Sequence, residues 1–254
     1  MVPERVEVVT LAVGDRYEDR YYARLHAMLA RHMPVPFGLT VATDRPRRLP
    51  PEVRTLDARD WNPRREGFRP TTDKLRLFDP GSGLPPEFLY LDVTLVIRGD
   101  LTPVLEFAYA SPAELVVVRD WNYDAYNTCA LRLRTGGRLQ AIHEAWLAGE
   151  THEHRVNGDQ DFVTAVVRDR GLEGAVATFP EGMVASYRNA RELARTDPAG
   201  AKAGLDAAPV VKFYGYLKMH QVASPIWRAK RWLKHPGERP ILGFWTRELR
   251  EAWR

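Results

Sequence analysis

The sequence has a single cysteine, Cys129, among 254 residues. One thiol can form neither an internal disulfide nor a multi-thiolate zinc site, so both are excluded and a reducing compartment is indicated. Long apolar runs are also missing: nowhere do about 18 apolar residues follow one another, as a transmembrane helix needs. Glu4 and Glu7 interrupt the first apolar stretch, unlike a secretory signal. These absences predict a cytoplasmic location.

A strong excess of one charge is missing as well. The 37 basic and 33 acidic residues give a net charge of +4, which is mild for a nucleic-acid-binding protein and equally suits a phosphate-bearing small molecule. Nucleic acid is therefore not the expected partner, and nothing indicates an oligomeric state. Basic residues do concentrate near the end of the chain, in "WRAKRWLKHPGERP".

Strand and helix patterns alternate along the chain. A β-rich apolar run over 5–13 precedes apolar residues at helical spacing in "DRYYARLHAMLARH", and a second strand pattern covers 37–44. This order predicts an α/β fold with a mostly parallel central sheet flanked by helices in a single domain. No clear period appears over 172–208. Further elements are predicted as a short helix at 71–79, strands within 86–100, 113–120, 127–133 and 208–220, helices at 136–149 and 158–171, and two short helices at the end.

A carboxylate is set into the buried-strand pattern "YLDVTLVIRGDL" at Asp92. Alternation along a strand would place Asp92 and Thr94 on one face and Val93 on the other, so both polar side chains would face one crevice. The alternative is that Asp92 only caps a turn.

Six segments carry a resemblance to a known family. "VVTLAVGDRY", "KLRLF", "FLYLDVTLVIRGDL", "YNTCALRL", "NGDQDF" and "VVKFYGYLKMH" stand in the order and near the spacing found in GT-A-fold glycosyltransferases of the glycogenin-like and bacterial galactosyltransferase-like group. The resemblance covers residues 5–222. It implies a Rossmann-like GT-A domain over 1–222, with 223–254 as a basic and aromatic helical extension packed on it. It also implies a nucleotide-sugar donor, expected to be a UDP-sugar, and a glycan, lipid-linked or small-molecule acceptor.

The metal-binding motif of that family is degenerate here. The family has Asp-x-Asp at the strand end and a later histidine, whereas this chain has Asp92-Val93-Thr94 and places Lys212 where the histidine would open "KFYGYLK". Mn²⁺ and Mg²⁺ prefer carboxylates, so Asp92 is the one remaining candidate ligand and no metal cofactor is expected. A cation on Lys212, with Lys218 on the other phosphate, could stabilise the leaving diphosphate instead.

Other site residues follow from the same resemblance. Asp159, Gln160 and Asp161 are expected to contact the donor sugar and, with Lys212, to form the catalytic set; an acidic helix start is the alternative. Independently of the resemblance, the segment "RDWNYDAYN" is dense in aromatic and acidic residues, as sugar-binding surfaces are, so Trp121, Asp124 and Asn127 are assigned to the acceptor; Trp121 also suits a core. Lys74 on a short helix could equally be solvated. The expected donor-binding residues are Thr10, Ala12, Val13, Gly14, Asp15, Tyr17, Thr43, Asp44, Lys74, Asp92, Val93, Thr94, Tyr214, Gly215 and Lys218.

The predicted function is transfer of a sugar from a nucleotide diphosphate to a hydroxyl group. An inactive GT-A domain that binds a nucleotide or glycan is the main alternative, favoured by the lost metal ligands. An enzyme acting on modified bases in DNA is a third interpretation, based on the basic tail. That tail could also contact the inner face of a membrane, or pack its tryptophans on the domain.

Overall fold

The computed structural model describes residues 2–152, 157–215 and 217–254. The chain forms two compact units. Unit 1 comprises Met1–Tyr22, Val35–Asp92 and Leu105–Phe179, and unit 2 comprises Ala23–Pro34, Val93–Val104 and Pro180–Arg254. None of the helices in the described ranges has the length and apolar character needed to cross a bilayer. A domain boundary at residue 222 stays a prediction.

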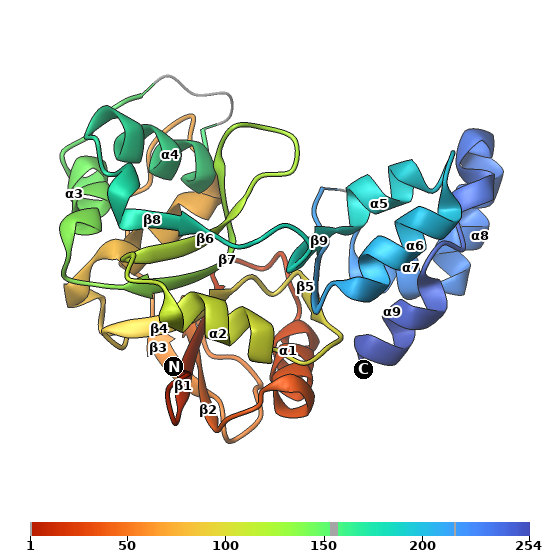
Figure 1. Cartoon of the computed structure of the whole chain (residues 1–254), viewed down its shortest axis with the longest axis horizontal. Helices are drawn as coiled ribbons and strands as arrows, with labels where there is room; N and C mark the ends of the chain where they lie inside the picture. Colours follow the sequence, from red (N-terminus) through yellow and green to blue (C-terminus); the bar gives the residue numbers. More distant parts are fainter. Residues whose placement is uncertain (1, 153–156, 216) are drawn as a thin grey trace. The chain divides into compact units, whose positions relative to one another are not determined.

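Unit 1 is built on a seven-stranded sheet (Figure 1). Four of its neighbouring strand pairs are parallel, and only one strand, 126–134, runs antiparallel to both of its neighbours. The expected α/β class with a mostly parallel sheet is thus confirmed. In hydrogen-bonding order, the strands are β3 (Arg54–Asp57), β2 (Phe37–Thr43), β1 (Val6–Ala12), β4 (Glu87–Leu91), β7 (Tyr126–Arg134), β6 (Leu115–Arg119) and β8 (Val176–Thr178).

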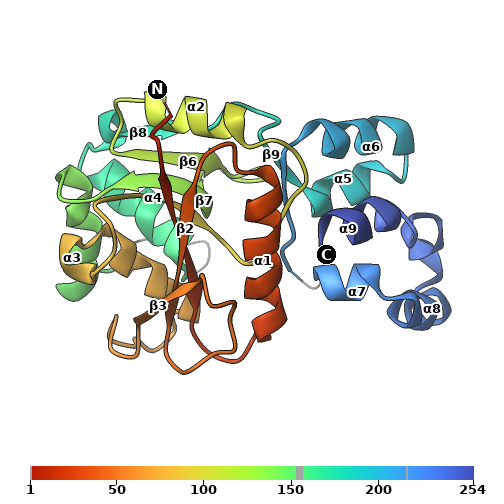
Figure 2. The ribbon, with the colours of Figure 1, turned by 90° about the horizontal axis from the view of Figure 1, so that it is seen from below.

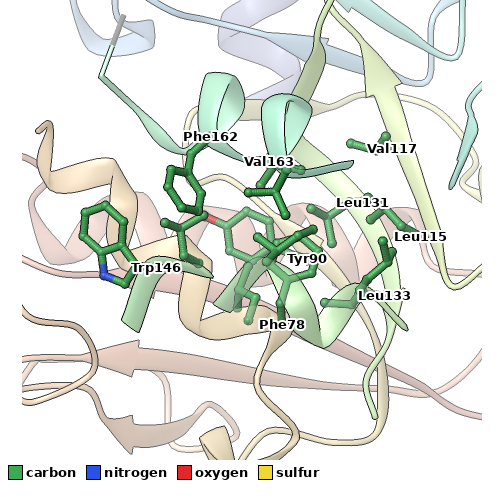
Figure 3. Close-up of a cluster of buried hydrophobic side chains, with 14 of the residues drawn as sticks. Phe78, Tyr90, Leu115, Val117, Leu131, Leu133, Trp146, Phe162 and Val163 are labelled. Atoms are coloured by element: carbon green, nitrogen blue, oxygen red, sulfur yellow. The ribbon is translucent and has the colours of Figure 1, made fainter. Parts of the chain in front are cut away.

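Helices cover both faces of this sheet, and β7 shows why. Leu131 and Leu133 point into a buried cluster with Phe162 and Val163 of α4 (Asp159–Asp169) (Figure 3). Arg132, between them, points the other way and donates hydrogen bonds to the carbonyl oxygen of Ala108 in α2 (Thr102–Ala110). Alternate residues of one strand therefore serve two layers. The remaining helical segments of unit 1 are η1 (Pro70–Phe78), η2 (Pro80–Ser82), η3 (Arg138–Gln140), α3 (Ala141–Leu147) and η4 (Glu173–Ala175).

The helix α1 (Asp19–His32) begins in unit 1 and ends in unit 2. Figure 2 shows α1 as one continuous helix. Leu25, Met28 and Leu29 are fully buried, which confirms the apolar face predicted from their spacing.

Unit 2 contains a three-stranded sheet in the order β5 (Leu95–Ile97), β10 (Val210–Lys212), β9 (Val184–Ser186). The ring of Tyr187 stacks on that of Phe213 with 4.2 Å between centroids. Three α-helices, not the expected two, follow Lys218. The helical segments of unit 2 that come after β9 are α5 (Tyr187–Leu193), α6 (Pro198–Ala207), α7 (Met219–Ala223), α8 (Pro225–Lys234), η5 (Pro236–Ile241) and α9 (Thr246–Ala252).

The stretch without a clear period, 172–208, contains β8, β9, α5 and α6. Its two strands have three residues each, which is too short to establish an alternation. The sequence signal was weak because these elements are short, although the chain there is folded.

Candidate active site

A sheltered lysine lies between two carboxylates in unit 1. The Nζ of Lys74 is 2.9 Å from Oδ1 of Asp92 and 3.3 Å from Oδ2 of Asp159. The three side chains are only 12%, 19% and 5% exposed, respectively. Because sheltered charges are costly unless they are paired, each of these groups depends on the others. We call these three residues the Lys74 cluster.

Three elements bring the cluster together. Lys74 lies on η1, Asp92 directly follows β4, and Asp159 is the first residue of α4, where the helix dipole favours a carboxylate. The backbone N–H of Asp92 donates to the carbonyl oxygen of Cys129 at 2.8 Å. This bond extends the pairing of β4 with β7 by one residue and fixes the carboxylate at the strand end.

Two hydroxyl groups complete the hydrogen bonding of the carboxylates. Tyr90 donates to Oδ1 of Asp92 at 2.8 Å, and Thr128 donates to Oδ2 of Asp159. Burial by itself lowers the pKa of Lys74, but the carboxylates of Asp159 and Asp92 outweigh it and raise that pKa above its usual range. Burial and the nearby Asp92 also raise the pKa of Tyr90. At neutral pH the cluster therefore contains an ammonium and a neutral phenol, and Lys74 is not the solvated lysine of the alternative interpretation.

The strand ends at Leu91, and residues 92–94 form a turn before β5. The expected strand alternation across Asp92 and Thr94 is therefore wrong, because it holds only for extended backbone. Thr94 has its own partner in unit 2, where its Oγ1 accepts a hydrogen bond from Nζ of Lys212 at 2.7 Å. Both of these side chains are buried.

The residues present do not fit the divalent ion of the resembled family. An oxygen of Asp92 is already bonded to Lys74 and Tyr90, and Thr94 offers only a hydroxyl that Lys212 engages. Within the ranges that the structure describes, no three His, Cys, Asp or Glu side chains are grouped to hold a metal. A hard cation needs more free carboxylate oxygens than this donor set provides.

A second group of predicted residues meets at the carboxyl ends of β1 and β2. The backbone N–H of Gly14 donates to Oδ2 of Asp44 at 2.9 Å, and the hydroxyl of Thr43 donates to the carbonyl oxygen of Ala12 at 3.2 Å. Gly14 has φ of +76°, a value that favours glycine. We call this group the β1–β2 edge.

Two acceptor atoms remain unsatisfied at or beside this edge. Oδ1 of Asp44 and Oγ1 of Thr10 are buried and have no hydrogen-bond partner among the described residues. The nearest cation to Oδ1 of Asp44 is Nε of Arg45, at 3.9 Å. Buried polar atoms are normally hydrogen-bonded, and the Asp44 side chain is 29% exposed, so its free oxygen is available to a ligand that donates a hydrogen bond.

Arg47 was not predicted, yet it holds the β1–β2 edge together. Its guanidinium donates to the carbonyl oxygens of Ala12 at 2.7 Å and Gly14 at 2.6 Å, and its side chain is buried. The Arg- and Pro-rich composition around residue 47 gave no signal that distinguished it from its neighbours. Of the other candidates here, Val13 packs against the buried cluster of Figure 3 and Asp15 is exposed.

Tyr17 interacts electrostatically with the Lys74 cluster. Burial raises the pKa of its phenol, Arg16 lowers it, and the charges of Asp92 and Lys74 act on it in opposite directions. The tyrosine therefore lies within electrostatic range of the Lys74 cluster.

The three predicted residues at the start of α4 do not act together. Asp159 belongs to the Lys74 cluster, whereas Asp161 lines an open cavity of about 380 Å³ whose wall also includes Tyr123 and Asp124. Gln160 is half-buried, and its side chain makes no hydrogen bond to any described residue. Of the three, Asp159 and Gln160 remain the donor-sugar candidates, and Asp161 shares its cavity with an acceptor candidate.

The acceptor candidates differ in their surroundings. Asp124 forms an ion pair with Arg168 at 2.8 Å beside that cavity. Asn127 is buried, and its side-chain amide donates to Oδ2 of Asp120 at 2.8 Å. Trp121 is half-buried. Asn127 therefore shapes the loop that carries Asp124.

The remaining predicted residues of unit 2, Tyr214, Gly215 and Lys218, lie after β10. The hydroxyl of Tyr214 donates to Oδ1 of Asn189 at 2.9 Å, a partner that the sequence did not indicate. Gly215 has φ of +72°, which favours glycine, and Lys218 is the N-cap of α7, where its backbone N–H donates to Oε1 of Gln221 at 3.0 Å.

Comparisons with known proteins point in one direction. No family model matches the chain, and no curated protein matches it in sequence. The galactosyltransferase LgtC, solved with donor and acceptor sugar analogs, matches with a TM-score of 0.53 and 17% identity over 91% of this chain and 95% of LgtC. The glycosyltransferase GlyE of Streptococcus pneumoniae TIGR4 matches at 0.54 and 14% identity, over 96% of this chain and 64% of GlyE. Mouse xyloside xylosyltransferase 1 matches at 0.51 and 12% identity, over 83% and 98% of the two chains. The chain has the GT-A glycosyltransferase fold.

Proposed function

We propose that this chain is a glycosyltransferase that moves a sugar from a UDP-sugar to a hydroxyl acceptor without a divalent ion. In this reaction the bond between the anomeric carbon and the diphosphate oxygen breaks, and its electron pair leaves with the diphosphate. The acceptor oxygen bonds to the anomeric carbon and loses its proton. The observation that carries the proposal is the Lys74 cluster, which combines buried opposite charges at a strand end of a GT-A fold.

The Lys74 cluster would receive the donor sugar. Asp159 and Gln160 offer oxygen and amide groups to sugar hydroxyls, and the negative carboxylates favour positive charge that develops at the anomeric carbon. Lys74 offsets part of this negative charge, which would otherwise repel the diphosphate of the donor. One LgtC structure is that of an active-site mutant with a glutamine-to-glutamate change. We take Gln160 as the glutamine to test here.

The leaving diphosphate requires positive charge in place of a metal. Lys212 and Lys218 are the proposed sources, because Lys212 replaces the expected histidine and an ammonium can stabilise a developing anion. The buried hydrogen bond from Lys212 to Thr94 supports this role, since it holds the ammonium in one orientation.

Metal independence is directly testable. Donor hydrolysis and sugar transfer are expected to proceed at the same rate in EDTA as in added Mn²⁺, because the donor set around Asp92 is already satisfied by Lys74 and Tyr90. The measurement is release of nucleotide diphosphate from a panel of nucleotide sugars. Activity that vanishes with the chelator and returns with Mn²⁺ would contradict the proposal.

The alternative is an inactive domain that binds a nucleotide or glycan, and the loss of the second carboxylate at Thr94 favours it. A thermal-shift panel separates the two, because a ligand at about 100 times its dissociation constant adds about 2.7 kcal/mol of stability. A shift with a nucleotide sugar that is never hydrolysed or transferred, whatever the acceptor, would support the binding module.

We further propose that the β1–β2 edge binds the nucleotide base. The Asp44→Asn substitution is expected to weaken nucleotide binding by about tenfold. The asparagine oxygen can still accept the hydrogen bond from Gly14, so the amide NH2 group, a donor, replaces the free acceptor oxygen that would face the base. Affinity is measured by calorimetry with UDP. Asp57→Asn, at the carboxyl end of the adjacent strand and exposed, is the matched control and is expected to bind normally. Equal weakening in both variants would remove the assignment.

A further inference from the structure

The helix α8 (labelled in Figure 1) presents large apolar side chains to solvent. Ile226 is 68% exposed and Leu233 is 69% exposed. They are seven residues apart, which is about two helical turns, so they share one side of the helix, with the exposed Ala229 between them. None of the residues of α8 is buried. An exposed apolar stripe of this kind is a candidate interaction surface.

Contacts on the opposite side hold the helix in this orientation. Trp227 and Arg231 are half-buried, and the guanidinium of Arg231 lies 5.3 Å from the ring centroid of Trp227. Nε of Arg231 donates to Oε2 of Glu238 at 2.5 Å, and the hydroxyl of Ser224 caps the helix by accepting from the N–H of Trp227 at 3.2 Å. The helix is therefore fixed within unit 2 by its other face, and the apolar stripe stays outward.

The border of the stripe is basic. Lys230 and Lys234 are exposed beside it, and neither forms an ion pair with any residue that the structure describes. From Ala207 to Gly237 the sequence has no Asp or Glu, whereas it has six Lys and Arg residues. Glu238, the carboxylate that pairs with Arg231 of α8, also pairs with Arg191 on the half-buried side. The charge of the exposed side is thus uncompensated.

We propose that α8 binds the surface of an anionic lipid bilayer. Ile226 and Leu233 enter the boundary between headgroups and acyl chains, while Lys230 and Lys234 contact headgroup phosphates, as in interfacial amphipathic helices. Nucleic acid would satisfy the lysines, but it offers no apolar layer for the two large aliphatic side chains. The inference goes beyond the proposed sugar transfer and does not depend on it.

The test is co-sedimentation of the full chain with vesicles. Binding is expected to vesicles of phosphatidylcholine mixed with phosphatidylglycerol and not to phosphatidylcholine alone, and it should fall with salt. The double substitution Ile226→Asn and Leu233→Asn is expected to weaken binding by about tenfold or more. Replacing Lys230 and Lys234 by glutamine is expected to weaken it by about fivefold per lysine.

The matched control is Leu147→Asn. Leu147 is 55% exposed at the end of α3 in unit 1, and its replacement should leave vesicle binding unchanged. Circular dichroism and the unfolding midpoint confirm that each variant is folded. Unchanged binding by the double asparagine variant, equal binding to phosphatidylcholine alone, or full competition by duplex DNA that does not require Ile226 and Leu233 would each overturn the proposal.

Discussion

Replacing Lys74 by methionine is expected to lower the rate of sugar transfer by about 100-fold or more and to destabilise the protein by about 3 kcal/mol. Methionine keeps the length of the side chain but removes the charge, so Asp92 and Asp159 lose the ammonium that lies 2.9 Å and 3.3 Å from them. Breaking a sheltered ion pair costs more than the pair contributes, because the remaining charges stay desolvated. Turnover and urea unfolding measure the two effects.

The pH dependence of stability separates the loss of the Lys74 ion pairs from a simple loss of packing. The folded-state pKa of Lys74 is raised, so its contribution is complete below the ordinary lysine value of 10.5 and is lost only as pH rises through the folded value. Titration of Lys74 should therefore not change the stability of the wild type near neutral pH. In the methionine variant this loss of stability at high pH should be absent, because the ammonium that titrates has been removed.

Lys202→Met is the control for the Lys74 prediction. Lys202 is 46% exposed and pairs with Asp206 on the surface of unit 2, so its loss is expected to leave both stability and turnover nearly unchanged. A Lys74→Met protein with normal turnover would show that the Lys74 cluster is only structural.

Replacing Glu238 by glutamine is expected to destabilise unit 2 by about 2 kcal/mol. Its carboxylate joins the guanidinium of Arg191 at 2.8 Å to that of Arg231 on α8. The side chain of Arg191 is only 5% exposed, so an uncharged partner would leave a buried cation without its counter-ion. Equilibrium unfolding in urea at neutral pH measures the loss.

Lowering the pH should reduce the difference in stability between the wild type and the Glu238→Gln variant. Hydrogen bonds from Arg231, opposed by burial and aided by Arg191, hold the pKa of Glu238 at about 2, compared with 4.5 ordinarily. A depressed folded-state pKa contributes stability that is complete above pH 4.5 and is lost as pH falls toward 2. Glu192→Gln, in an exposed pair with Arg195, is the control and should cost less than about 0.5 kcal/mol. If the difference in stability between wild type and Glu238→Gln did not depend on pH, the loss could not be attributed to the charge of Glu238.

The sequence predicted most of the elements because their signals are local. The apolar run ending at Ala12 and the helical spacing of Leu25, Met28 and Leu29 appear in the structure as β1 and α1. A strand or helix buries a face that recurs with a fixed period, so neighbouring residues are sufficient to reveal it. The same local logic failed over 172–208, where the strands are too short to show a period.

The family resemblance placed Asp92 at a strand end, and the local acidic pattern placed Asp159 at a helix start. Only the tertiary structure decided that Lys74 is the cation beside them, that Thr94 instead bonds Lys212, and that Asp161 lies on a different cavity from Asp159. Lys74 and Asp159 are far apart in the chain, and their contact depends on how η1, β7 and α4 pack together. Such distances are set by packing and strand register, which no single segment encodes.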